Sequence, residues 1–128
     1  MPESDMYKEQ ILDLFKHPIH FGPLIGATHT AHKLNPSCGD EFTIQLLVRD
    51  GKVVNAMFTG SGCAISTASI CLLTDALVGK MVDDAKAFTS DDLRKLLGVP
   101  VSAARVSCMT LGLDCLRVAL EVQRPKSE

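Results

Sequence analysis

The sequence predicts an α+β fold in which helices pack on one face of a small, three-stranded antiparallel sheet. Three observations lead to this class. Residues 41–49 and 52–60 alternate apolar and polar side chains and flank Asp50-Gly51, a pair typical of β-hairpin turns. Apolar residues with helical spacing occur both before and after this hairpin. The resulting order of helix, sheet and helices is typical of α+β domains.

The first element is expected to be a helix from Asp5 to Lys16, with Asp5 as its N-terminal cap. Its apolar face would consist of Tyr7, Ile11, Leu12 and Phe15. The segment that follows contains the helix-breaking residues Pro18, Gly22, Pro23 and Gly26. Residues 27–34 are a weaker candidate for the first strand.

The hairpin is expected to bury one face only. Its first strand has apolar residues at alternate positions, namely Phe42, Ile44, Leu46 and Val48. The same alternation on the second strand selects Val54, Ala56 and Phe58. Because the intervening positions are more polar, the sheet should have a single buried side.

Three further helices are expected, at residues 64–78, 91–97 and about 103–122. Gly79 and Gly98 would end the first two of these helices. Ser90 and Ser102 would cap the starts of the last two.

The composition favours one domain spanning residues 1–128, with frayed ends at about 1–4 and 123–128. The chain has 128 residues, of which 46% are hydrophobic, and this is enough for a core. The formal net charge of −2 gives no electrostatic basis for binding nucleic acid or an anionic membrane. Since the sequence has neither a signal peptide nor an apolar run of membrane-spanning length, we expect a cytoplasmic protein.

The chain has five cysteines, Cys38, Cys63, Cys71, Cys108 and Cys115, and an odd number in a reducing compartment argues against a disulfide framework. An α-helix rises about 1.5 Å per residue, so Cys63 and Cys71 would be roughly 12 Å apart and Cys108 and Cys115 roughly 10.5 Å. Thiolates that share one tetrahedral zinc ion lie within about 4 Å of each other. Each helix can therefore donate at most one thiolate to a shared ion.

A fourth ligand would have to be a different type of residue. Asp40 is the natural candidate because it follows Cys38 across a glycine, and a carboxylate oxygen can bind zinc. One of the four histidines could compete for this place: His17, His20, His29 or His32.

Position within the helices separates the first pair of cysteines but not the second. Cys63 lies at a glycine-flanked turn from strand to helix, where unpaired backbone N–H groups and the helix dipole favour a thiolate. Cys71 lies among Ile70, Leu72 and Leu73, which favours a buried, apolar role. Periodicity does not choose between Cys108 and Cys115.

Three motifs, in this order and at this spacing, resemble the iron–sulfur cluster assembly scaffold family of IscU and SufU, the NifU N-terminal-like domain. They are NPSCGDE from Asn35, GSGCAISTAS from Gly60 and ARVSCMTLG from Ala104. The resemblance extends over nearly the whole chain. It implies that the metal ligands are Cys38, Asp40, Cys63 and Cys108.

The resemblance implies a function as well. The three thiolates and one carboxylate would hold a [2Fe–2S] cluster on a scaffold that accepts sulfur from a cysteine desulfurase and supplies downstream acceptor or carrier proteins. Alternatively they would hold Zn²⁺, as in SufU, and the protein would be a sulfurtransferase that relays persulfide sulfur. A purely structural zinc site is a third interpretation, disfavoured because the sequence lacks a C-x-x-C pair.

The two branches of the family imply different persulfide acceptors, Cys38 by likeness to SufU and Cys108 by likeness to IscU. Arg105, three residues before the last motif cysteine as in SufU, could stabilise an anion near Cys108. Ser107 stands where IscU proteins usually have a histidine, whereas the short segment between Cys63 and Cys108 is typical of IscU. A homo-oligomer is compatible with the sequence.

Overall fold

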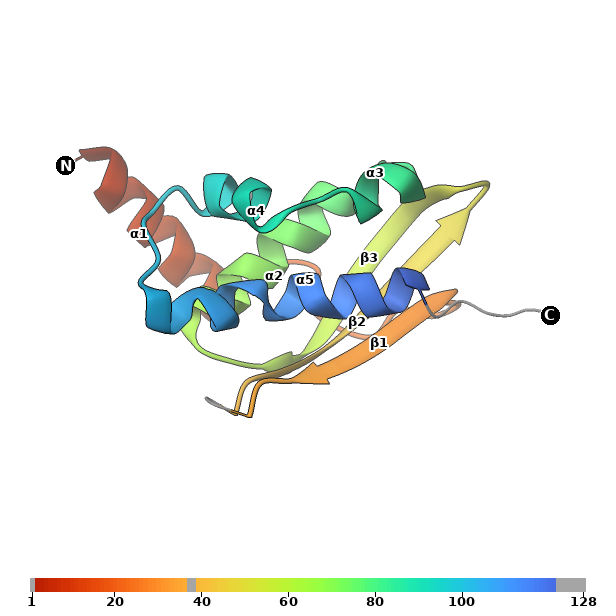
Figure 1. Ribbon diagram of the computed structural model, residues 1–128, viewed down its shortest axis with the longest axis horizontal. Helices are drawn as coiled ribbons and strands as arrows, with labels where there is room; N and C mark the ends of the chain where they lie inside the picture. Colours follow the sequence, from red (N-terminus) through yellow and green to blue (C-terminus); the bar gives the residue numbers. More distant parts are fainter. Residues whose placement is uncertain (1, 37–38, 122–128) are drawn as a thin grey trace.

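The computed structural model describes residues 2–36 and 39–121. Three strands form an antiparallel meander in the order β1-β2-β3 (Figure 1). Their bounds are His29–Leu34 for β1, Glu41–Arg49 for β2 and Lys52–Ser61 for β3. Leu34 pairs with Glu41, and Glu41 pairs with Ser61. The end of β1, the start of β2 and the end of β3 therefore lie side by side at one end of the sheet.

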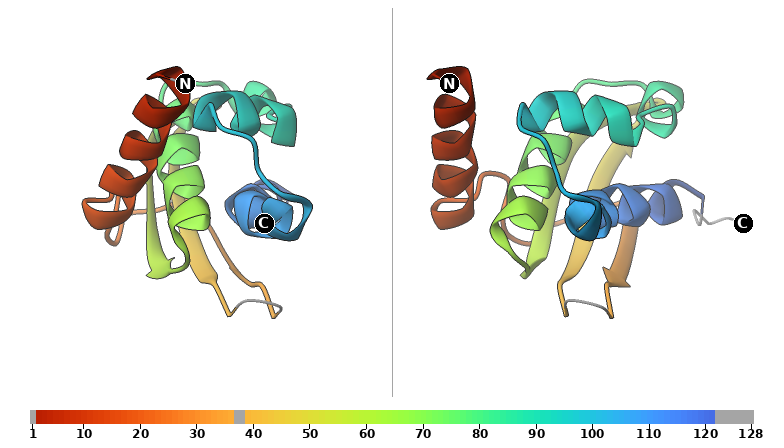
Figure 2. Two further views of the ribbon diagram at one scale, coloured as in Figure 1. Left: turned by 90° about the vertical axis from the view of Figure 1, so that its left-hand side faces the viewer. Right: turned by 60° about the vertical axis from the view of Figure 1, so that its left-hand side comes forward.

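The helices are α1 (Pro2–Lys16), α2 (Ala64–Leu77), α3 (Val82–Lys86), α4 (Ser90–Leu97) and α5 (Val106–Glu121), with the 3₁₀ helix η1 (Ala103–Arg105) directly before α5. Helices α2 and α5 contact each other and lie across one face of the sheet, where α2 contacts β3 and α5 contacts β1 and β2 (Figure 2). Helices α1 and α4 pack against α2 from outside this layer. The arrangement confirms the predicted α+β class.

The core lies between the sheet and helices α2 and α5. The fully buried side chains with the largest volumes include Phe42, Phe58, Leu73, Met109 and Leu116. None of the helices in the described residues is long and apolar enough to cross a membrane.

The hairpin has the predicted turn, but the predicted burial of one residue on its second strand, Val54, is not observed. Asp50 and Gly51 both have positive φ angles, 54° and 76°, as a type I′ turn requires. The pairing register shifts between Leu47 and Val48, because Val54 is an extra residue on β3. This bulge buries Val53 completely and leaves Val54 37% exposed, so the predicted burial of Val54 is wrong.

Several helix ends and faces differ from the predictions. Helix α1 begins at Pro2 rather than at Asp5. It buries Ile11 and Leu14, whereas Leu12 and Phe15, predicted on its apolar face, are 50% and 43% exposed.

The N-cap of α4 is Thr89, not Ser90, because the Thr89 hydroxyl accepts the Asp92 N–H while the Asp92 carboxylate accepts the Thr89 N–H. Ser102 precedes η1 without a side-chain cap hydrogen bond, so its predicted capping role is wrong, and α5 begins only at Val106. Helix α3 is an additional element, since five residues are too few for a periodic pattern.

Candidate metal centre

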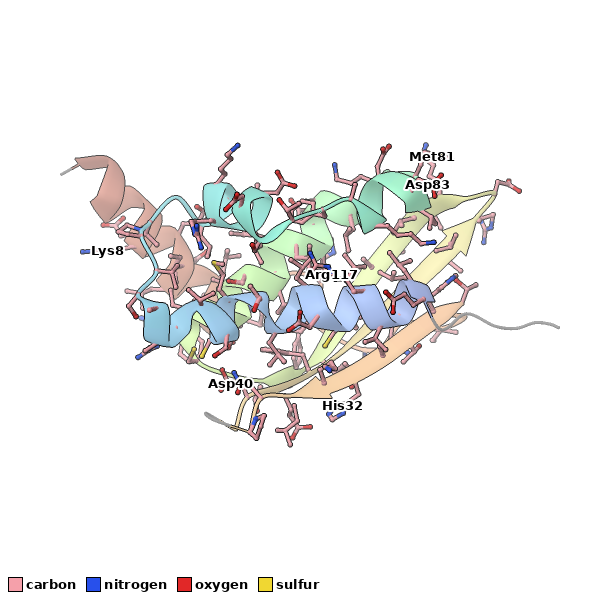
Figure 3. All side chains as sticks on the ribbon, in the orientation of Figure 1. Lys8, His32, Asp40, Met81, Asp83 and Arg117 are labelled. Carbon is pink, nitrogen blue, oxygen red and sulfur yellow. The ribbon has the colours of Figure 1, made fainter. Side chains whose placement is uncertain are left out.

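Three of the predicted ligands meet at one end of the molecule. One ligand atom from each of Asp40, Cys63 and Cys108 lies within 4.8 Å of the other two. Asp40 directly precedes β2, Cys63 lies between β3 and α2, and Cys108 lies in the first turn of α5. Figure 3 shows Asp40 at the end of the sheet that faces the start of α5. The site is therefore formed by the ends of elements far apart in the sequence.

Asp40 is held by hydrogen bonds from two directions. Its side chain is nearly buried, and its Oδ2 accepts the Cys63 backbone N–H at 3.4 Å. Its backbone carbonyl accepts the Asn35 N–H at 2.8 Å, and the Gly39 N–H bonds to the Asn35 carbonyl at 2.8 Å. These bonds close the turn from β1 to β2 and fix Asp40 beside the start of α2.

The start of α2 is suited to anionic ligands. Cys63 is its N-cap residue, with an extended backbone at φ −71° and ψ 175°. Within the described residues, α2 begins without a side-chain cap and without an acidic residue in its first turn. The positive end of its dipole is therefore available to the Asp40 carboxylate and to the half-buried Cys63.

Gly62 permits this close approach. A Cβ atom at this position would overlap Ser66 Oγ and would lie 3.0 Å from Phe42 Cζ and 3.1 Å from Asp40 Cγ. Only a residue without a side chain lets the end of β3 pass this close to the Asp40 carboxylate. The Ser66 hydroxyl meanwhile donates to the Cys63 carbonyl at 3.1 Å, which tightens the first turn of α2.

The remaining two cysteines of these helices lie elsewhere. Cys71 and Cys115 are completely buried in the core, and burial raises the pKa of each thiol to about 11. Cys115 Sγ lies 3.5 Å from the Phe42 carbonyl oxygen, to which it donates. Cys108, 6% exposed, is the α5 cysteine that faces Asp40 and Cys63.

Two thiolates and a carboxylate fit a zinc ion or an iron–sulfur cluster. Thiolate ligands suit both, and a carboxylate oxygen can serve as a further ligand beside them. The separation of at most 4.8 Å among the donor atoms is close to the roughly 4 Å expected for ligands of one tetrahedral ion. The described residues thus include a group that could hold a metal ion.

Other predicted site residues are placed differently. Cys38 lies outside the described residues, two positions before Asp40. Arg105 is exposed on η1. In the described part of the chain the ligand group contains no histidine: His20 bonds to Asp75 at 3.0 Å and His32 to Glu41 at 2.9 Å.

The fold and the ligand group can be compared with known proteins. Residues 6–127 match the family of the NifU-like N-terminal domain. The chain belongs to this family. It is 35% identical to the iron–sulfur cluster assembly scaffold protein IscU of Thermotoga maritima, over 94% of this chain and 96% of that protein. It is 30% identical to the zinc-dependent sulfurtransferase SufU of Bacillus subtilis, over 87% of this chain and 86% of that protein.

A solved structure agrees with this placement. The crystal structure of a proposed SUF-system iron–sulfur cluster assembly scaffold protein from Fervidobacterium islandicum matches with a TM-score of 0.77 and 29% identity. The match covers 91% of this chain and 98% of that one. Membership of the IscU/SufU family, predicted from the three sequence motifs, is thereby confirmed.

Residues that position the candidate ligands of this NifU-like domain were not recognised from its sequence. Asn35, 8% exposed, donates from Nδ2 to Ser107 Oγ at 3.2 Å and so links the β1–β2 turn to α5. Asn35 and Gly62 both lie inside quoted motifs, three residues before Cys38 and one before Cys63. Their position beside the cysteines was the available signal, whereas their partners could not be read from the sequence.

Proposed function

We propose that this protein is a scaffold on which iron–sulfur clusters are assembled, with Asp40, Cys63 and Cys108 as ligands together with Cys38. The observation that carries the proposal is the meeting of Asp40, Cys63 and Cys108 within 4.8 Å in a chain of the NifU-like family. Structural zinc sites are usually closed by paired cysteine knuckles. Here the ligands come from separate loops and helix ends, which suits a site that is filled and emptied.

The chemistry of the donor set supports release as well as binding. A carboxylate oxygen is a harder ligand than a thiolate and binds the iron of a cluster less firmly. A site with one carboxylate therefore has a defined weak point. Asp40 would be the residue at which a [2Fe–2S] cluster detaches on its way to an acceptor protein.

Sulfur would arrive as a persulfide on a cysteine desulfurase. A thiolate of this protein attacks the outer sulfur, the S–S bond of the donor breaks, and the desulfurase cysteine leaves as a thiolate. The step moves one sulfur atom without net oxidation or reduction. Cys38 and Cys108 are the candidate acceptors, and the exposed Arg105 would stabilise the anion near Cys108.

A second candidate function is persulfide relay by a zinc-bound form. It is supported by the 30% identity to a zinc-dependent sulfurtransferase and by a donor set that suits Zn²⁺ equally well. In this form the protein passes sulfur onward without building a cluster on itself. A thiolate already bound to zinc must first be released before it can attack a persulfide.

Anaerobic reconstitution tests the two functions against each other. The protein is incubated with ferrous iron, cysteine, a desulfurase and excess thiol, which reduces the persulfide sulfur to sulfide, and is then measured by visible absorption and by iron, sulfide and zinc analysis. A scaffold gives a coloured protein with iron and sulfide in equal amounts, and Cys63→Ser abolishes the colour. A persistently colourless zinc protein that still stimulates the desulfurase would contradict the scaffold proposal and favour relay.

We predict that Asp40→Ala slows transfer of the reconstituted cluster to an apo acceptor protein by about tenfold, which corresponds to a release barrier higher by about 1.4 kcal/mol. The reason is that the substitution removes the weakest attachment point. The measurement is the loss of scaffold absorption as the acceptor gains activity. Transfer from the variant at the wild-type rate or faster would show that Asp40 is not the point of release.

A further inference from the structure

A hydrogen bond between two distant segments lies next to the ligand group. Asn35, the residue after β1, donates from Nδ2 to the hydroxyl of Ser107 in the first turn of α5 at 3.2 Å. The two residues are 72 positions apart in the sequence. In Figure 1 the end of β1 and the start of α5 lie at the same end of the molecule.

Each partner is directly connected to a ligand. The Asn35 N–H bonds to the Asp40 carbonyl at 2.8 Å, so the backbone of Asn35 is tied to that of Asp40. Ser107 immediately precedes Cys108. The side-chain bond therefore completes a short path from the carboxylate ligand to the thiolate ligand, and this path bypasses the core.

We propose that Asn35 and Ser107 are a positioning pair that sets the separation of Asp40 and Cys108 and thereby controls how fast the site releases its metal. This inference rests on the proposed function, because it assumes that the two ligands share a metal. Neither residue needs to touch the metal. Their effect comes from holding the β1–β2 turn against the first turn of α5.

The fold does not depend on the hydrogen bond between Asn35 and Ser107 for its stability. Helix α5 is anchored by completely or almost completely buried residues, among them Met109, Leu113 and Leu116. Ser107 is exposed, and one hydrogen bond accepted by its hydroxyl contributes only about 1 kcal/mol to the free energy of unfolding. Metal sites tolerate displacement of a ligand by only about 0.5 Å, so loss of this bond should affect the site far more than the fold.

The surroundings of Ser107 allow a matched set of variants. A surface hollow of about 230 Å³ is lined by both Asn35 and Ser107, so the extra methyl group of threonine has room. Ser107→Ala removes the acceptor hydroxyl, and Ser107→Thr retains it. Thr110→Ala is the control, because the Thr110 hydroxyl donates to the Val106 carbonyl within α5 and makes no link to the turn.

The test uses Co²⁺ as a spectroscopic probe in the full-length protein, with its thiolate charge-transfer and d–d bands reporting the site. Release to a competing chelator is followed by the loss of these bands. We expect Ser107→Ala to release Co²⁺ about tenfold faster than the wild type with shifted d–d bands, the scale seen for residues behind metal ligands. Ser107→Thr and Thr110→Ala should behave as the wild type does.

A double-mutant cycle with Asn35→Ala completes the test. If the two residues act as a pair, Asn35→Ala combined with Ser107→Ala releases Co²⁺ no faster than the faster single variant. Unchanged release from Ser107→Ala, or an equal acceleration by Thr110→Ala, would overturn the inference even if Asn35→Ala proved unstable. A wild-type protein without thiolate-to-cobalt bands would instead refute the proposed ligand set, so the two failures are distinguishable.

Discussion

Helices α2 and α5 each have one cysteine at the start and one in the middle, and the two positions differ in their neighbours. At the starts, Cys63 and Cys108 lie with Asp40, whereas in the middle Cys71 and Cys115 are completely buried in the core. Both middle thiols have pKa values raised to about 11 because burial disfavours the thiolate. The same residue type is thus a candidate ligand in one place and a small apolar residue in the other.

The difference teaches that the position of each cysteine along its helix decides whether it lies beside Asp40 or in the core. A helix start offers unpaired N–H groups and a positive dipole end, and it is reached by turns from other elements. A helix middle offers neither, and here it is packed between the sheet and the partner helix. The buried cysteines contribute to the packing that keeps the two helix starts together.

The largest expected difference between the two pairs of cysteines is in their effect on metal affinity. We predict that Cys63→Ser and Cys108→Ser each weaken Zn²⁺ binding by roughly 100- to 1,000-fold, since a binding free energy of about 10–16 kcal/mol is shared among four ligands. Cys71→Ala and Cys115→Ala should leave the affinity within about threefold of wild type, because these thiols are too far away to coordinate. Competition with a chromophoric chelator at pH 7 measures all four.

The same four proteins provide the control. In thermal unfolding of the metal-free forms, Cys71→Ala and Cys115→Ala should each lower the free energy of unfolding by about 1 kcal/mol, because each leaves a small cavity. The two serine variants should barely change it. A loss of zinc affinity in Cys115→Ala as large as that in Cys108→Ser would mean that α5 presents a different cysteine to the site.

A smaller effect is expected when a methyl group is added at Gly62, beside the candidate site, or at Gly112, in the core. A Cβ at Gly62 would crowd Asp40, Phe42 and Ser66, whereas one at Gly112 would lie 3.0–3.2 Å from Ile70 between α2 and α5. Both Gly62→Ala and Gly112→Ala should therefore lower the free energy of unfolding by about 2 kcal/mol. Only Gly62→Ala should also weaken Zn²⁺ binding, by about tenfold.

Urea unfolding and chelator competition on the two glycine variants make the measurement. The expected result is that both variants lose stability, whereas only Gly62→Ala loses Zn²⁺ affinity. Equal losses of zinc affinity in both variants would indicate that metal binding follows overall stability rather than the geometry around Asp40.

Alkaline pH is expected to affect stability alone, without involving the candidate ligands. Thiols of the unfolded chain ionise near their ordinary value of 9.0, but burial holds the pKa of Cys71 and Cys115 at about 11. Above pH 9 the unfolded state releases protons that the folded state keeps, so stability is lost as pH rises from about 9 to 11. The loss should be on the order of 1–2 kcal/mol for each thiol.

Urea unfolding of the metal-free protein at pH 8, 9, 10 and 11 measures this slope. Cys115→Ala should lose less stability across this range than the wild type, because it lacks one of the two buried thiols. The prediction would be wrong if the wild type and Cys115→Ala lost stability in parallel, since the buried thiol would then ionise no later than an unfolded one.

Much of the fold could be predicted because its signals are local. Asp50-Gly51 adopts the two positive φ angles that a type I′ turn requires, and the alternation at Phe42, Ile44 and Leu46 matches their burial. Predictions failed where a distant partner overrode the local pattern. The bulge on β3 exchanges the burial of Val53 and Val54 but leaves the rest of the predicted β3 face buried. Helix α1, which packs against α2, buries Leu14, whereas Leu12 and Phe15 remain exposed.

The candidate site shows the same division. Helix rise alone limited each helix to one thiolate, and the glycine turn favoured Cys63 over Cys71. The choice of Cys108 over Cys115 came from the family resemblance, because one helix offers both residues and only its packing decides which one faces the turn. The ligand roles of Cys38, Asp40, Cys63 and Cys108 remain predictions that the metal experiments address.

The sequence by itself determined the α+β class, the hairpin turn, the family and the small set of residues able to bind a metal. These depend on contacts between near neighbours or on motifs that can be read along the chain. Only the tertiary structure decided that Asp40, Cys63 and Cys108 share one location, that Gly62 must lack a side chain and that Asn35 bonds to Ser107. Each of these depends on where separate elements end in space, which is set by packing of the sheet against α2 and α5.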